Sequence, residues 1–170
     1  MKSLISFAVM VLLINAPCLC QHNRNVTAGQ EAKLKNLKDE VSRDLTQNIL
    51  KYWSLKMPDN VNGGFYGRID ATEKVYPDAE KGGILNARIL WTFSSAFRIL
   101  KDTSYLRIAE RAKEYILDRF IDPESGGAYM SLKADGTPLN DRKHVYTNAF
   151  FIYALSEYYR ATGDKAALDE

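Results

Sequence analysis

The fold of this chain is decided by residues 81–100, which read KGGILNARILWTFSSAFRIL. Across positions 84–100, nearly every face of a helix would carry Leu, Ile, Trp, Phe or Ala. A helix that is apolar on all sides is normally enclosed by protein, so we predict a buried helix that begins at Gly83. Asn86 and Arg88 are the polar exceptions near its N-terminal end, and buried polar groups need partners.

A helix of a different kind precedes this stretch. Its apolar side chains recur at spacings of three and four, which is typical of an amphipathic helix. They are Leu34, Leu37, Val41, Leu45, Ile49 and Trp53. We expect this helix to end at Met57, because Pro58 disfavours helix in the residue before it. The Gly-rich residues 62–67 then predict a hairpin connection.

The same order of elements occurs a second time. Asp102 is expected to cap an amphipathic helix, and the double glycine 126–127 and a strand-like pair around 135–136 follow it. A second broadly apolar helix is predicted at 147–160. The apolar face of the amphipathic helix consists of Leu106, Ala109, Ala112, Ile116 and Phe120. Its charged residues, which include Arg107 and Arg111, predict a solvated outer face.

Aligning the two double glycines, with a one-residue gap, reveals a repeat of about 62 residues. Equivalent pairs are Lys81 and Lys143, Asn86 and Asn148, Trp91 and Tyr153, and Arg98 and Arg160. One unit cannot bury its inner helix alone, so several must stack into a ring or solenoid with the apolar helices inside. Residues 164–168 begin a third unit. We therefore expect an all-α repeat fold in a longer polypeptide, and a chain that is inactive and poorly soluble by itself.

The N-terminal residues and the composition limit the class of protein. Lys2 and the apolar run 4–14 predict a secretory signal peptide at residues 1–20, followed by a mobile lead-in at 21–31 and a folded domain at 32–170. The run is shorter than the roughly 20 apolar residues of a membrane span, so we expect export to the periplasm or the exterior and no span. A net charge of +2 without a basic block argues against a nucleic-acid partner.

Five strings of the sequence resemble sugar 2-epimerases of the cellobiose and N-acylglucosamine type. They are GGFYG at 63–67, KGGILNARILWTFS at 81–94, GGAY at 126–129, KHVY at 143–146 and AFFIYALSEYYRATGD at 149–164. The resemblance covers about residues 32–170 and implies an (α/α)6 barrel that inverts C2 of a reducing-end glucose or mannose unit. It implies a monosaccharide or oligosaccharide substrate, and neither a metal nor another cofactor. Met130 stands where this family usually has Trp, which bears on substrate preference.

Arg88 is the candidate catalytic residue. Inversion at C2 removes a proton next to the C1 aldehyde and leaves an enediolate, whose negative charge a fixed guanidinium can stabilise. The alternatives are that Arg88 pairs with a carboxylate of a later helix or extends its head group to the rim. The paired catalytic histidines that the family implies lie beyond this sequence, and neither His22 nor His144 is expected to replace them.

Four further residues are candidates for substrate binding. Tyr146 could direct its hydroxyl into the cavity or close the barrel rim. Asn148 could contact sugar or, like Asn86, bond the backbone of a hairpin. Tyr66 and Tyr129 could offer flat faces to a pyranose or wedge the hairpins against the helices.

Two other functions remain open from the sequence. A glycoside hydrolase or lyase could use a similar helical barrel, but hydrolysis needs two carboxylates. The inner helices show none near Arg88 or Tyr146, since Glu157 lies three turns into its helix. The third hypothesis is a helical-repeat protein that binds sugar without turnover.

Overall fold

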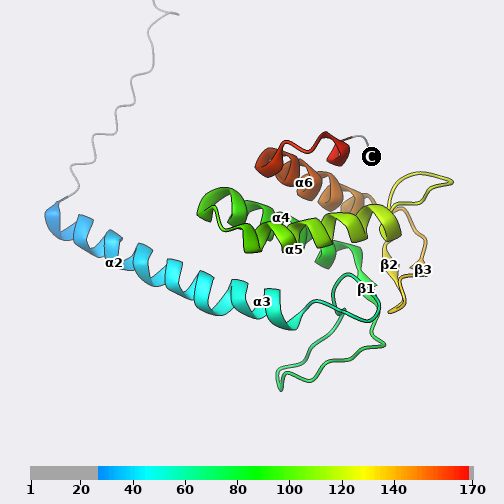
Figure 1. Cartoon of the computed structure of the whole chain (residues 1–170), viewed down its shortest axis with the longest axis horizontal. Helices are drawn as coiled ribbons and strands as arrows, with labels where there is room; N and C mark the ends of the chain where they lie inside the picture. Colours follow the sequence, from blue (N-terminus) through cyan, green and yellow to red (C-terminus); the bar gives the residue numbers. More distant parts are fainter. Residues whose placement is uncertain (1–26, 169–170) are drawn as a thin grey trace, which may run out of the picture. The chain divides into compact units, whose positions relative to one another are not determined.

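The inner helix begins where the sequence predicts. In the computed structural model, which describes residues 27–168, α4 spans Gly83–Leu100 and its counterpart α6 spans Val145–Thr162 (Figure 1). The outer helix α5 spans Thr103–Tyr115 and continues into a π-helical turn, Ile116–Phe120. Asp102 caps α5 by accepting a hydrogen bond from the backbone N–H of Ser104, as predicted. A short 3-10 turn, Lys165–Ala167, follows α6.

The first helix begins earlier than the sequence analysis predicted. α2 spans Ala28–Asp44, so residues 28–31, which the sequence analysis assigned to the lead-in, are helical. The cause is a capping box, in which Gln30 N–H donates to Thr27 Oγ1 and Thr27 N–H donates to Gln30 Oε1. The signal peptide and the rest of the lead-in lie outside the described residues. No helix within 27–168 is long and apolar enough to cross a membrane.

A π-helical turn, Leu45–Ile49, joins α2 to α3, which spans Leu50–Lys56. The helical conformation is therefore continuous to the predicted end before Pro58, although it is not one regular α-helix. The chain forms two compact units that divide after Val41, and the inner helices, the hairpins and α5 belong to the second unit.

The core of this second unit lies around α4, which packs against both α5 and α6. The predicted apolar face of α5 and the π-helical turn after it is confirmed, because Ala109, Ala112, Ile116 and Phe120 are fully buried and Leu106 is partly buried against the core. The prediction that α4 is enclosed on every side is only partly right. Arg88, Ile99 and Leu100 are exposed, and Ile152 and Tyr153 of α6 are exposed as well.

A small sheet joins the two repeats. The predicted strand pair is present as β2, Ser131–Leu132, and β3, Pro138–Asn140. A strand that the sequence did not reveal, β1 at Lys81–Gly82, pairs antiparallel with β2. The N–H of Gly83 also donates to the carbonyl of Met130 over 3.0 Å. The start of α4 is therefore fixed by the hairpin of the second repeat.

Each double glycine forms a turn with positive φ angles. The values are 78° and 59° at Gly63 and Gly64, and 70° and 68° at Gly126 and Gly127. The ring of Tyr115 lies directly on the first turn, and a Cβ added at Gly64 would stand 2.6 Å from it. Glycine is needed here for both the backbone conformation and the close contact.

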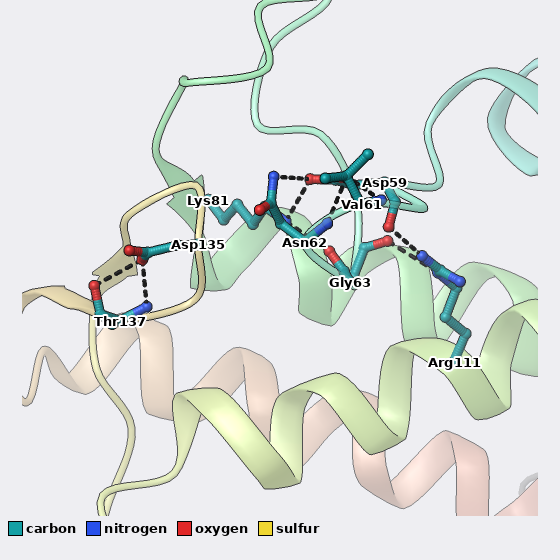
Figure 2. A network of polar contacts seen from close by, with 9 residues as sticks. Asp59, Val61, Asn62, Gly63, Lys81, Arg111, Asp135 and Thr137 are labelled. Atoms are coloured by element: carbon teal, nitrogen blue, oxygen red, sulfur yellow. Dashed lines mark hydrogen bonds and ion pairs between the residues drawn. The ribbon is translucent and has the colours of Figure 1, made fainter.

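A buried ion pair holds the first turn (Figure 2). Lys81 Nζ donates to Asp59 Oδ2 over 2.9 Å and to the carbonyl of Gly63 over 2.6 Å. The Asp59 carboxylate also accepts the backbone N–H groups of Val61 and Asn62. Burial raises the pKa of Asp59, but these donors outweigh that effect and the pKa is lowered overall.

Arg111 reaches the same turn from α5. Its Nε donates to the carbonyl of Gly64 over 3.0 Å, and its Nη2 donates to the carbonyl of Asp59 (Figure 2). The prediction that Arg111 faces solvent is therefore wrong. The helical spacing placed Arg111 on the charged side of α5, whereas its long side chain reaches across to the turn and donates to two of its carbonyls.

The second repeat contains the same device, which confirms the alignment of Lys81 with Lys143. Lys143 Nζ donates to Asp122 Oδ2 over 2.7 Å, and that carboxylate accepts the N–H groups of Glu124 and Ser125. The ammonium of Lys143 and these N–H groups lower the pKa of Asp122 to about 2. The two pairs differ in burial, since 33% of the Lys143 side chain is exposed and only 1% of the Lys81 side chain.

We predict that Lys81→Met lowers the free energy of unfolding by about 3–5 kcal/mol, because it leaves the Asp59 carboxylate buried without its cation. Lys143→Met is the matched control. It should cost clearly less, since water reaches the Asp122 pair. Urea unfolding of the two variants measures the difference, and equal losses would contradict the role assigned to burial.

Candidate functional site

The candidate site is a cavity of about 580 Å³ between α4 and α6. Its lining comes from one stripe of each inner helix, at spacings of three and four residues. The residues are Arg88, Trp91, Thr92, Tyr146, Ala149, Phe150 and Tyr153. Arg88 and Tyr146, which the sequence analysis proposed separately, are thus brought to one cavity.

The four aromatic residues of the lining form one continuous series of ring contacts. Trp91 and Tyr153 are stacked, with ring centroids 5.2 Å apart and planes 12° apart. The ring of Phe150 meets Tyr146 edge to face at 4.9 Å and Tyr153 at 6.4 Å. The resulting wall combines apolar faces with phenolic hydroxyls, which suits a ligand that has both C–H faces and hydroxyl groups. The sequence signal for this wall was present, because the four rings follow the helical spacing of Arg88 and Tyr146.

Arg88 is exposed, and its guanidinium carbon lies 5.3 Å from the centroid of the Phe150 ring. No carboxylate among residues 27–168 forms an ion pair with it. Tyr146 is also exposed, by 55%. Both side chains are accessible to a ligand in the cavity, and their roles in catalysis and binding stay predictions.

The side chain of Asn148 hydrogen-bonds to the backbone of its own repeat. Its Oδ1 accepts the N–H of Ala128 over 2.9 Å, and its Nδ2 donates to the carbonyl of His144 over 3.0 Å. It does not line the cavity. The hairpin-bonding alternative therefore describes its observed contacts, and sugar contact by Asn148 stays a prediction. Asn86 makes the matching bond to the carbonyl of Gly82, while its own Oδ1 is buried without a partner in the described structure.

Tyr66 and Tyr129 lie on the two hairpins and do not line the cavity. The N–H of Tyr66 donates to the carbonyl of Met57, and the N–H of Tyr129 donates to the carbonyl of Phe120. Lys143 Nζ lies 4.1 Å from the Tyr129 ring centroid. Burial and the nearby Asp122 carboxylate raise the pKa of Tyr129. The backbone bonds hold both hairpin segments, and the role of the two rings, as a wedge or as a sugar contact, stays a prediction.

The remaining titratable candidates lie away from the cavity. His144 is exposed and precedes α6, and His22 is outside the described residues. Glu157 is buried, where it accepts Ser95 Oγ over 2.9 Å and Arg98 Nε over 2.8 Å. In the described part of the chain, no group of three or more His, Cys, Asp or Glu residues could hold a metal ion.

The family follows from comparison with known proteins. A family model described as N-acylglucosamine 2-epimerase (GlcNAc 2-epimerase) matches residues 64–170. The chain belongs to this family. The cellobiose 2-epimerase of Bacteroides fragilis is 53% identical over 132 residues, which are 78% of this chain and 34% of that protein.

Solved structures of the family also match. The cellobiose 2-epimerase of Spirochaeta thermophila superposes with a TM-score of 0.79 at 36% identity, over 84% of this chain and 35% of that one. That of Bacillus thermoamylovorans gives 0.77 at 42% identity, over 79% of this chain and 34% of that one. The predicted (α/α)6 barrel class is confirmed, with only part of the barrel present. The chain spans about a third of the length of these relatives.

We predict that Asn148→Ala lowers the free energy of unfolding by about 1–3 kcal/mol, because the N–H of Ala128 and the carbonyl of His144 lose their partner. Urea unfolding measures this loss. Asn140→Ala, on β3, is the control and should cost less, because Asn140 donates only to the weak acceptor Met130 Sδ and accepts only the N–H of exposed Arg142. A sugar-contacting role for Asn148 would instead leave stability unchanged and weaken binding of the substrate.

Proposed function

We propose that the polypeptide carrying this chain is a sugar 2-epimerase, which inverts C2 of the reducing-end aldose of a disaccharide such as cellobiose. The observation that carries the proposal is the Arg88 guanidinium, exposed at an aromatic cavity and without a carboxylate partner among the described residues. The 53% identity to a cellobiose 2-epimerase supports this choice of substrate class.

The chemistry explains why an arginine of this kind is needed. Once the sugar ring has opened, a base removes the C2 proton and the electron pair moves toward the C1 oxygen, which gives the enediolate. A guanidinium stays protonated and offers several N–H donors to that oxygen, and the Tyr146 hydroxyl can donate from the same cavity. Return of a proton to the opposite face of C2 inverts the centre. We assign the two bases to histidines other than His22 and His144, as the family resemblance implies.

The cavity favours epimerisation over hydrolysis. A glycoside hydrolase needs a pair of carboxylates beside the scissile bond. The described cavity lining contains neither Asp nor Glu. Glu157, the acidic residue of α6, is held by Ser95 and Arg98 in the core.

The expected result for the full-length natural polypeptide in heavy water is conversion of cellobiose to its C2 epimer with one deuterium at C2, measured by NMR and mass spectrometry. Arg88→Gln should lower kcat by about 10²–10³-fold, because it removes a charged donor to the enediolate. Arg107→Gln, on the exposed side of α5, should leave kcat unchanged. Release of free glucose, or binding of cellobiose without deuterium exchange, would overturn the assignment.

Export is part of the proposal. The apolar run at 4–14 supports removal of residues 1–20 during secretion. N-terminal sequencing of protein recovered outside the cytoplasm should give a chain that begins at Gln21. A chain that retains Met1 and stays in the cytoplasm would rule this out.

A further inference from the structure

Phe150 occupies the centre of the cavity wall. It is half-buried, and its ring contacts Tyr146 on the previous turn of α6 and Tyr153 on the next. The opposite helix contributes Arg88, whose guanidinium carbon lies 5.3 Å from the ring centroid. This is a cation–π distance, so the ring of Phe150 is in contact with the head group of Arg88.

A cation–π contact, unlike an ion pair, leaves an arginine free to bind an anionic ligand. A carboxylate would also hold the guanidinium, but it would occupy N–H donors and offset the charge that the anion requires. An aromatic face attracts the cation through its quadrupole and accepts no strong N–H hydrogen bond. The guanidinium keeps its full charge and its donors remain available to the ligand.

The ring is itself held in place by its neighbours. The two edge-to-face contacts, with Tyr146 and Tyr153, restrict rotation of the Phe150 side chain. Tyr153 is in turn stacked on Trp91, which lies one turn after Arg88 on α4. The chain of contacts returns to the helix that carries the arginine, so the position of the cation depends on both inner helices.

We propose that Phe150 is a positioning residue for Arg88, which holds the guanidinium toward the cavity without neutralising it. The proposal rests on the proposed epimerase function, because it is the enediolate that the held cation would meet. Phe150 touches the arginine and acts through it.

The test replaces Phe150 in the full-length polypeptide with phenylalanines of increasing fluorination, which weaken the π face while keeping the shape of the ring. We expect kcat to fall progressively, by about tenfold at pentafluorophenylalanine, with KM nearly unchanged, because the lost interaction acts on the transition state. Phe150→Leu, which removes the ring, should lower kcat at least as much. Phe150→Tyr, which keeps an aromatic face, should keep kcat close to that of the unsubstituted protein. Circular dichroism and thermal unfolding show whether each variant is folded.

Phe151 provides the matched control on the same helix. It is 3% exposed and packs on Phe120 at 5.4 Å, on the core side of α6. The same fluorination at Phe151 should leave kcat unchanged. A flat response at Phe150, with deuterium exchange at C2 intact, would overturn the positioning role alone. Absence of exchange in the unsubstituted protein would overturn the proposed function itself.

Discussion

The ion pair between Asp59 and Lys81 is the contact on which the described second unit depends. Both side chains are withdrawn from water, so their attraction must be accompanied by hydrogen bonds to the remaining lone pairs and protons. The double-glycine turn supplies these bonds through backbone N–H groups and the carbonyl of Gly63. Lys81 is also the first residue of β1, two residues before α4 begins. Together with the pairing of β1 with β2, the ion pair therefore holds the segment from which the inner helix starts, and with it the position of Arg88.

The ion pair and its glycine turn occur in both repeats, and the second repeat packs on the turn of the first. The outer helix of the second repeat covers the turn of the first, with Tyr115 on the glycines and Arg111 on the carbonyls. The ion pair of the first repeat is buried by this cover, whereas that of the second, at Asp122, remains partly exposed. Burial of an ion pair by the following unit is consistent with stacked repeats, in which each unit is stabilised by its contact with the next.

The cavity is lined by the faces of the inner helices that do not pack in the core. Phe151 and Ala154 of α6 face the core, and Phe150 and Tyr153, one position away from each, face the cavity. The same helix thus carries a packing surface and a binding surface side by side. A cation placed on the second surface, beside rings and away from the carboxylates of the described residues, keeps its charge for a ligand.

The sequence by itself determined the repeat, the start of α4 and the cap of α5, which follow from self-similarity, helical spacing and local propensity that the order of residues encodes directly. The choice of Arg88 and Tyr146 rests on the family resemblance and stays a prediction. The tertiary structure alone decided the pairing of β1 with β2, the inward reach of Arg111 and the place of Phe150 under Arg88. Those contacts join residues tens of positions apart, and they depend on how the helices cross and how far a side chain extends, which spacing along one helix does not specify.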